Sequence, residues 1–528
     1  MPSRVLLSSV FKPFGVDNIY GRRDSKIELY HNQITKYQGV FSMRSFADSF
    51  GLHAIANNIE VPTTVLDYPT LPRFIHELKK NYDIVGIGGI VPNFQKIKKM
   101  AELVREISPG STLVLGGFCA SIPGLKEILD VDHICIGEGI SFMRGILGLP
   151  RDFQYKNPDM YAMEREVMGV PIRVSKYPHI AVGLGCSYGC DFCSPSHFFG
   201  RRHIKLYTNG RDLFNEMMRM KKLFRTNVMS FIGDDNFLID LKRAEELRKC
   251  VVESGEIFNI FLFASADKVA AFGVERLAEM GAGMVWIGRE GIVSEYAKNR
   301  GIDMKALVAE LRSFGIKTIL SSILLLEEHT SENIIEDIED HLACNPAFSQ
   351  FAHYSALPGT PLYKKLDEQR RILHHIPLEE WHAFKQPWFI HPHFNLIEGE
   401  NIQDLAYTRD FLELGPSLLR YIAADYEGWR NLRNSDNHQL RKRAEFLAGQ
   451  MWKYKIILKA VTFLAPTAHI RSLANKTLAD ISGDFGGLNP AQYGIARGFH
   501  LAGRVRQLRT ALWGDNMQPP TKVIYYNQ

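Results

Sequence analysis

Three cysteines that stand close together in the sequence have the clearest potential for chemistry. Cys186, Cys190 and Cys193 occur in the stretch Cys-Ser-Tyr-Gly-Cys-Asp-Phe-Cys, directly after the apolar run 179–185. Thiolates at spacings of four and three residues can wrap one face of an iron–sulfur cluster, which is usually held by four thiolates. Three protein ligands therefore leave one iron open to a ligand that is not protein. Zinc is the alternative, because it also binds clustered cysteine and histidine, and His197 could complete such a site.

Phe192 directly precedes the third cysteine. The stretch therefore reads Cys-x-x-x-Cys-x-aromatic-Cys, which resembles the signature of the radical S-adenosylmethionine (SAM) enzymes. The resemblance implies a 4Fe-4S cluster on Cys186, Cys190 and Cys193, with SAM on the open iron and Phe192 beside its adenine. It also implies that the reduced cluster cleaves SAM to a 5′-deoxyadenosyl radical, which abstracts hydrogen from a substrate. An electron donor such as flavodoxin or ferredoxin is then an implied partner.

The length and composition are typical of a soluble globular protein of about three domains. The 528 residues are 45% hydrophobic and 23% charged. No apolar run reaches the ~18 residues that indicate a membrane span. The first ten residues turn polar too soon for a signal peptide, and seven cysteines are few for a disulfide framework in this length. These features predict a cytoplasmic protein.

Residues 1–150 alternate short apolar runs with helix-like stretches, which predicts an α/β domain with a parallel sheet. The predicted strands are 4–10, 63–66, 84–90, 112–115 and 133–136, with a helix at 93–107. Ligands bind such sheets beyond the carboxyl ends of the strands. Glycines follow three of these ends, where they would let a backbone approach a bulky ligand or simply form tight turns. Residues 11–51 interrupt the sheet and are a candidate cap for it.

The order of these glycines resembles the Rossmann-like cobalamin-binding domain that precedes the barrel in one large class of radical SAM enzymes. The matching text is Gly-Gly-x-x-x-x-x-Pro at 116–123, followed by Gly-Glu-Gly at 137–139. Cys119 stands where many relatives have histidine, and the Asp-x-His-x-x-Gly motif for a lower cobalt ligand is missing. The resemblance implies cobalamin without a histidine ligand, bound by Gly88, Gly89, Gly116, Gly117, Cys119, Gly137, Glu138 and Gly139. A domain that has lost the cofactor is the alternative.

Residues 175–370 repeat strands and helices in a pattern that suits a partial (β/α) barrel, whose chemistry lies at the C-terminal strand ends. The predicted strands after the cysteines are 228–232, 257–264, 284–287, 317–326 and 348–355, with helices at 241–254 and 306–314. Polar residues at these strand ends are therefore candidates for contacts with SAM.

Asp234 or Asp235, after the first of these strands, can meet the amino group of SAM, because an ammonium requires a nearby carboxylate. A helix N-cap is the alternative for one of the two. Ser265 and Glu290 end the next two strands, and by resemblance Glu290 accepts the ribose hydroxyls. Capping is again the alternative for Glu290. The sequence Leu-Pro-Gly-Thr-Pro-Leu-Tyr at residues 357–363 is similar to that of the cobalamin-dependent branch. The sequence of residues 325–332 departs from the family pattern.

Residues 371–528 are predicted to be mainly helical and basic, since 401–528 contain 17 Lys/Arg against 10 Asp/Glu. In 450–464 one helical stripe carries Trp452, Ile456, Ala460 and Phe463. A basic helix with such a stripe can lie on an anionic membrane surface, or it can be an ordinary core-facing helix. Further arginines favour a peripheral contact with the inner membrane: Arg497, Arg504, Arg506 and Arg509. The segment lacks a nucleic-acid-binding motif, so no nucleic-acid partner is expected.

Together these features predict a cobalamin-dependent radical SAM methyltransferase. The expected reaction is C-methylation of an unactivated carbon in a lipid such as a hopanoid, because the text is similar to radical SAM groups of bacterial lipid biosynthesis. The first alternative is radical C–C coupling or ring formation without methyl transfer. The second is an iron–sulfur sensor or binding protein without turnover. The sequence assigns no catalytic acid or base.

Overall fold

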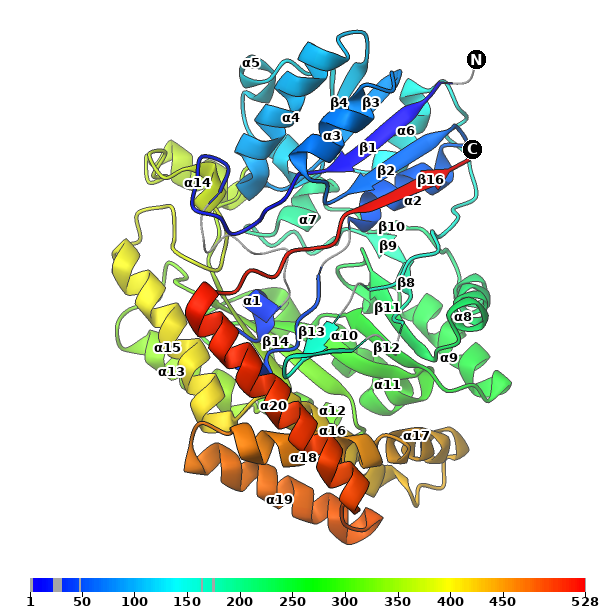
Figure 1. Ribbon diagram of the computed structural model, residues 1–528, viewed down its shortest axis with the longest axis vertical. Coiled ribbons are helices and arrows are strands. Elements are labelled where there is room, and N and C mark those ends of the chain that lie inside the picture. Colours follow the sequence, from blue (N-terminus) through cyan, green and yellow to red (C-terminus); the bar gives the residue numbers. More distant parts are fainter. Residues whose placement is uncertain (1–2, 22–30, 47–48, 163–164, 173–175, 528) are drawn as a thin grey trace.

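The protein is described by a computed structural model that covers residues 3–21, 31–46, 49–162, 165–172 and 176–527. The two six-stranded sheets lie at different levels of the molecule, and a layer of helices lies beyond the second (Figure 1).

The first sheet has the strand order β16-β2-β1-β3-β4-β5, and all its strands except β16 are parallel. Its strands are β1 Val5–Ser9, β2 Thr63–Asp67, β3 Ile84–Gly88, β4 Thr112–Gly116, β5 His133–Ile134 and β16 Lys522–Tyr526. The five parallel strands agree with the sequence prediction. Their order is that of a doubly wound sheet whose direction of winding reverses between β1 and β3, which is where such sheets bind ligands.

Helices cover both faces of this sheet because each buries one apolar stripe. In α4, Ile97, Met100, Ala101 and Val104 are buried at the spacing of one helical face. The helices are α2 Phe50–Asn58 and α6 Gly139–Ile146 on one face, and α3 Leu71–Leu78 and α4 Phe94–Ile107 on the other. Shorter helical segments in this region are α1 His31–Ile34, η1 Gly39–Phe41, η2 Val91–Asn93, η3 Phe118–Ser121 and α5 Leu125–Ile128.

The second sheet contains six parallel strands in sequence order, which is the connectivity expected of a partial (β/α) barrel. Its strands are β8 His179–Ala181, β11 Val228–Ile232, β12 Asn259–Phe263, β13 Ala282–Glu290, β14 Lys317–Leu324 and β15 Phe348–His353. The helices between them are α8 Gly210–Phe224, α9 Leu241–Ser254, α10 Ala266–Phe272, α11 Val274–Met280, α12 Met304–Ser313 and α13 Asn333–Ala343. Two short pairs accompany this sheet, β6 Arg165–Val167 with β7 Val170–Ile172 and β9 Gly183–Leu184 with β10 Ile204–Lys205.

A shared hydrophobic core holds the two sheets together. Trp381 and Trp388 stack at 5.7 Å between ring centroids, and they belong to the same cluster as Phe74 and Met100 beneath the first sheet. The cluster also contains Ala356, just beyond β15. The connection after the barrel, α14 Pro361–Glu368 and η6 Leu378–Glu380, therefore fixes the first sheet against the C-terminal end of the second.

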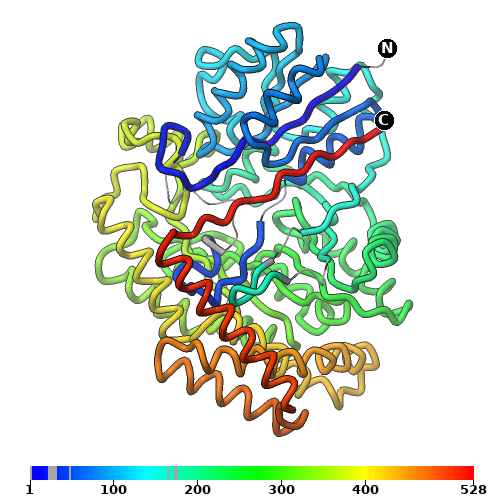
Figure 2. Tube along the Cα trace, viewed as in Figure 1, coloured from blue at the N-terminus to red at the C-terminus, as the bar shows by residue number. Residues whose placement is uncertain are grey.

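The rest of the chain is helical, as predicted, except at its end. The helices are α15 Leu396–Leu414, α16 Ser417–Leu432, α17 His438–Ala448, α18 Met451–Leu464, α19 Ala468–Phe485 and α20 Pro490–Trp513. Strand β16 then returns to pair antiparallel with β2, so both ends of the described chain lie in the first sheet (Figure 2). This strand is not among those predicted from the sequence. None of the helices in the described part of the chain has the length and hydropathy needed to cross a bilayer.

Helix α18 corrects one expectation. Ile456 and Ala460, two members of the predicted membrane-facing stripe, are buried at 3% and 0% exposure, whereas Trp452 is 51% exposed. Lys455 is also buried, and its ammonium donates to the carbonyl oxygens of Phe485 and Gly486 at 3.0 and 2.6 Å. The helix is therefore the core-facing alternative, since most of its apolar stripe packs inside the protein.

Candidate active site

The cysteine loop runs from β9 to α7, Ser194–Phe198, and short hydrogen bonds fix its shape. Ser196 Oγ donates to the Cys186 carbonyl at 2.7 Å and accepts from the Gly189 N–H at 3.2 Å. Gly189 has a φ of 72°, a left-handed conformation that favours glycine. The ring Nε2 of His197 lies 3.0 Å from the Cys190 carbonyl, so the loop backbone already occupies this nitrogen.

The three thiols have the character of ligands that need a metal to become thiolates. Burial raises the pKa of Cys186 and Cys190, and it raises the pKa of Cys193 to about 12. A bound metal deprotonates such thiols because its charge outweighs the cost of burial. Among the described residues, no group of three or more metal-binding side chains converges on a single ion. In a cubane cluster each thiolate takes a different iron, so its ligands do not converge on one point.

Phe192 lies between two tyrosine rings. Its centroid is 5.3 Å from that of Tyr296 and 6.0 Å from that of Tyr354, both edge-to-face. Both tyrosine hydroxyls donate to the carboxylate of Asp191, at 2.7 and 2.8 Å. Phe192 is therefore held in a fixed aromatic wall beside the thiols. A ring fixed in this way can pack against the flat ring of a ligand.

The two candidate aspartates have different environments. Asp234 is buried, and its Oδ2 accepts from Arg243 at 2.7 Å and lies 3.0 Å from His203 Nε2. Burial alone would raise the pKa of Asp234, but the His203 and Arg243 contacts lower it. By contrast, Asp235 is exposed at its surface, but the surrounding protein and the charge of Asp234 raise its pKa to about 7. Asp235 is near enough to influence the Cys186 thiol. The charge of Asp235 therefore acts on the Cys186 and Cys193 thiols, whereas Asp234 belongs to a buried ion pair.

Ser265 and Glu290 occupy the strand ends predicted for them. The Ser265 hydroxyl accepts from Asn236 Nδ2 at 3.0 Å, and the Ser265 N–H donates to Asn236 Oδ1 at 3.1 Å. Glu290 ends β13 with a φ of 65° and pairs with the buried Lys298. Burial alone would lower the pKa of Lys298, but Glu290 and the Cys190 thiol outweigh it and raise this pKa. A non-glycine residue in this conformation indicates a strained strand end at the site.

The glycines at the edge of the first sheet do not all have the same role. Gly117 has a φ of 82°, and a Cβ there would lie 2.4 Å from the Gly89 carbonyl oxygen. It is therefore required for the close approach of two loops. At Gly116 a Cβ would meet only Cys135 Cβ, at 3.8 Å, which is ordinary contact. Gly88 and Gly139 make room for side chains of α2, since a Cβ there would lie 3.0 Å from Leu52 and 2.8 Å from Ile55, respectively.

Cys119 and Glu138, two of the predicted cobalamin residues, have different surroundings. The Cys119 thiol is fully buried and donates to the Gly116 carbonyl at 3.3 Å, because η3 turns its side chain into the core. The Glu138 carboxylate caps α6 by accepting from the backbone N–H groups of Ile140 and Ser141 at 2.5 and 2.8 Å. The Cys119 side chain does not line the cavity described below, whereas Glu138 does.

We expect the Cys119→Ala variant to bind cobalamin with unchanged affinity, because the thiol packs in the core. It should lose about 1 kcal/mol of unfolding free energy from the small cavity created. Urea unfolding and titration with hydroxocobalamin measure the two quantities. A tenfold loss of affinity at normal stability would show that the thiol contacts the ligand.

One cavity of about 1510 Å³ connects the two sheets. Seven of the predicted cobalamin residues line it at the edge of the first sheet: Gly88, Gly89, Gly116, Gly117, Gly137, Glu138 and Gly139. Alternate residues of the second sheet point to the same face and line its other part, among them Ser230, Phe261, Met284, Trp286 and Ile319. Leu184 and Phe198, on either side of the cysteine loop, and Gly233 also line the cavity, whereas residues 186–193 do not.

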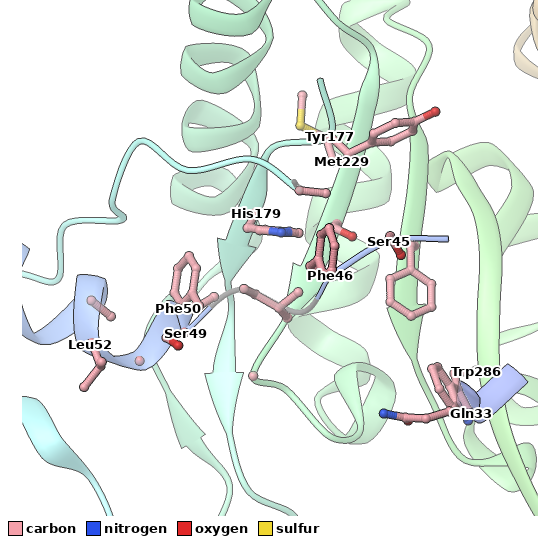
Figure 3. Close-up of a pocket in the computed structure, with 18 of the residues that line it drawn as sticks. Gln33, Ser45, Phe46, Ser49, Phe50, Leu52, Tyr177, His179, Met229 and Trp286 are labelled. Atoms are coloured by element: carbon pink, nitrogen blue, oxygen red, sulfur yellow. The ribbon is translucent and has the colours of Figure 1, made fainter. Parts of the chain in front are cut away.

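The N-terminal segment between β1 and β2 forms a wall of this cavity. Figure 3 shows Ser45, Phe46 and Phe50 from this segment opposite His179 of β8 and Trp286 of β13. The Phe50 and His179 rings meet edge-to-face at 6.3 Å. Part of the candidate cap proposed for residues 11–51 therefore lies over the barrel interior, although residues 22–30 and 47–48 fall outside the described chain.

Several site residues could not be found from the sequence. Asp191, Tyr296, Tyr354, Asn236 and Lys298 meet the predicted residues only through the fold. Two of them have a sequence signal, since Asp191 stands inside the cysteine motif and Asn236 directly follows Asp235.

No family model matches the chain. Among curated proteins, it is 22% identical over 327 residues to an uncharacterised methyltransferase of Pyrococcus horikoshii, covering 53% of this chain and 69% of that protein. It is 22% identical to the bacteriochlorophyllide d C-8(2)-methyltransferase of Chlorobaculum tepidum, and the match covers 58% of this chain and 72% of that protein. It is also 22% identical to the anaerobic magnesium-protoporphyrin IX monomethyl ester cyclase of Rubrivivax gelatinosus. That match covers 55% of this chain and 59% of the cyclase. These relatives agree with the prediction of an enzyme.

The similarity of this structure to solved structures identifies its fold. TsrM from Kitasatospora setae, a radical SAM methyltransferase solved with tryptophan and a SAM analogue, superposes with a TM-score of 0.53 at 15% identity, covering 83% of this chain and 90% of TsrM. The chain has the fold of TsrM. A second TsrM structure, with cobalamin and a [4Fe-4S] cluster bound, gives a TM-score of 0.52 at 15% identity and covers 92% of this chain and all of TsrM. The groups bound in TsrM match the cofactors predicted from the sequence.

Proposed function

We propose that this chain is a cobalamin-dependent radical SAM methyltransferase that C-methylates a large apolar substrate, a membrane lipid such as a hopanoid. The observation that carries the proposal is the single cavity shared by the glycine edge of the first sheet and the inner face of the second. A methyl carrier and a radical generator must reach one substrate carbon. The cavity joins the glycine edge, where cobalamin is proposed, to the inner face of the second sheet, and Leu184 and Phe198, which flank the cysteine loop, line it. The cysteine motif and the fold of TsrM support the same reaction.

The side chains present fit the three cofactors. Cys186, Cys190 and Cys193 would hold the cluster. Phe192 in its aromatic wall, Asp235 and Glu290 would hold SAM, with Ser265 in support. The charge of the buried Asp234 would act on Asp235. The open space at Gly116 and Gly137 would hold cobalamin. When bound, the cluster and SAM supply the substrate radical, and cobalamin supplies the methyl group.

The chain itself positions the substrate and excludes water. Phe46, Phe261, Met284, Trp286 and Phe348 give the barrel part of the cavity an apolar, aromatic lining. Such a lining binds apolar substrates by removing their surface from water, and it protects radicals from side reactions. The lining supports a polycyclic lipid, and the tetrapyrroles named for two relatives are also large ring systems. A donor such as flavodoxin or ferredoxin is part of the proposal.

The test is an anaerobic assay with reconstituted protein, hydroxocobalamin, SAM, a reductant and a bacterial lipid extract. We expect S-adenosylhomocysteine and 5′-deoxyadenosine to rise together, and only when lipid is present. Mass spectrometry quantifies both products and identifies the methylated lipid. If 5′-deoxyadenosine rises alone, methyl transfer is contradicted.

A second candidate is radical ring formation, which the similarity to the Rubrivivax cyclase favours. The same assay with magnesium-protoporphyrin IX monomethyl ester distinguishes it. A cyclase would form 5′-deoxyadenosine and a product without the mass of an added methyl group. Peripheral contact with a membrane is also part of the proposed function, and the structure bears on where it would occur.

A further inference from the structure

Helix α20 presents an apolar stripe to solvent. Leu501, Val505, Leu508 and Leu512 follow one another at spacings of four, three and four residues, so they share one face of the helix. Their exposed fractions are 65%, 57%, 61% and 61%. Trp513, 64% exposed, follows at the end of the helix. A run of exposed large apolar side chains of this kind marks an interaction surface.

The opposite side of α20 already packs against the protein. Ala496 is fully buried, and a Cβ on Gly503 would lie 2.7 Å from Leu464 of α18. Figure 1 shows α20 crossing the outer surface of the molecule between the helical layer and the connection to β16. The apolar stripe, Leu501, Val505, Leu508 and Leu512, is therefore additional to the packing that holds the helix in place.

Positive charge borders the stripe on both sides. Helix α20 contains no aspartate or glutamate. On the helical wheel Arg497 and Arg504 lie on one side of the stripe and Arg509 on the other, and all three are exposed. In the described part of the chain none of these three is in an ion pair, whereas Arg506 points inward and pairs with Glu166 and Asp515 at 3.1 Å.

We propose that the stripe of α20 docks this protein on an anionic lipid surface. A helix with an exposed apolar face and flanking arginines lies in the membrane interface, with the apolar side chains below the headgroups and the charges among them. Each arginine near an anionic surface strengthens binding roughly fivefold. The surface lies on α20, not on residues 450–464, whose apolar stripe is mostly buried.

The charges argue against a second copy of this chain as the occupant. Stripe-to-stripe pairing of two α20 helices would bring Arg497, Arg504 and Arg509 of each copy together. Helices that pair through an apolar seam place opposite charges beside it, and α20 has no acidic residue to supply them. Anionic headgroups supply the missing charge. The inference does not rest on the proposed reaction, because docking requires neither cofactor nor substrate.

The test is flotation of the full-length protein with vesicles of phosphatidylcholine, alone or mixed with phosphatidylglycerol. We expect the wild type to float with the mixed vesicles only. The Leu501→Gln/Leu508→Gln variant should bind at least about tenfold more weakly, because two side chains no longer enter the interface. The Arg504→Gln/Arg509→Gln variant should lose roughly 25-fold, fivefold for each arginine. Leu223→Gln/Val252→Gln, at exposed positions of α8 and α9, is the matched control and should bind normally.

Thermal unfolding of each variant checks that the fold is intact. The proposal is overturned if wild type stays in solution with both kinds of vesicle, or if the control variant loses as much binding as the stripe variant. It is also overturned if the protein sediments as a dimer that Leu508→Gln dissociates while vesicles bind nothing, since the stripe would then join two copies. Flotation involves no turnover, so a negative flotation result would not contradict the proposed reaction. A negative methylation assay would likewise not contradict docking on the membrane.

Discussion

In the Cys190→Ala variant, the rate of SAM cleavage is expected to fall by a factor of about 10³ or more. The cofactor, and not the protein, supplies the radical chemistry. Cys190 is the central thiol of the loop, and its carbonyl is held by His197 and by the Cys193 N–H. Two remaining thiols would leave two irons of a cubane without protein ligands. Iron content, the visible absorption of the cluster and the yield of 5′-deoxyadenosine measure the loss.

A matched control separates loss of the cluster from loss of the fold. Cys250 is buried in α9, away from the loop, at 1% exposure. We expect Cys250→Ala to keep its iron and its SAM cleavage, with only a small decrease in melting temperature. If Cys190→Ala cleaved SAM at the wild-type rate, the radical SAM assignment would fail. The Cys186→Ala and Cys193→Ala variants should behave like Cys190→Ala, since each removes one of three equivalent ligands.

The sequence predicted the elements better than it predicted their contacts. Except for β16, the strands of both sheets were recognisable because each contains a short run of mainly apolar residues, and glycines directly follow some of them, such as β3 and β4. Asp234 and Asp235 were indistinguishable in the sequence, because the difference between them comes from Arg243 and His203, which the fold brings to Asp234 alone. Lys298 could not be predicted, since its short 3-10 helix, Ala297–Asn299, carries no motif and Lys298 meets Glu290 only in three dimensions.

Strand β16 and the stripe of α20 show a second limit. Residues 522–526, Lys-Val-Ile-Tyr-Tyr, have the β-branched and aromatic composition of a strand, but only the fold shows that they pair with the edge of β2. Both 450–464 and 490–513 are apolar with basic residues, so periodicity alone cannot say which stripe is buried. The packing of the two helices shows which stripe is buried. Helix α18 lies between other helices, and α20 covers it from outside. Of the two alternatives for residues 450–464, the structure therefore shows the core-facing one, and the exposed apolar stripe lies on α20.

The Gly116→Val variant should separate methyl transfer from SAM cleavage. A Cβ at Gly116 fits without a clash and the backbone is not left-handed, so the first sheet should fold. The added methyl groups would narrow the cavity where cobalamin is proposed to lie. Overpacking of this kind costs about 1–3 kcal/mol, which corresponds to a loss of cobalamin affinity of roughly 10- to 100-fold. We expect S-adenosylhomocysteine to fall by a similar factor, while 5′-deoxyadenosine stays within a few-fold of wild type.

Two further glycines make this experiment specific. Gly110 lies in a turn before β4 with no atom within 4 Å of its Cβ position, so Gly110→Val adds the same side chain and should leave cobalamin binding unchanged. Gly117→Ala would place its Cβ 2.4 Å from the Gly89 carbonyl oxygen, and it should lower stability and both products together. Unchanged cobalamin affinity in Gly116→Val would contradict the glycine edge as the binding site. A parallel loss of both products and of melting temperature in that variant would instead show that Gly116, like Gly117, is needed for the fold.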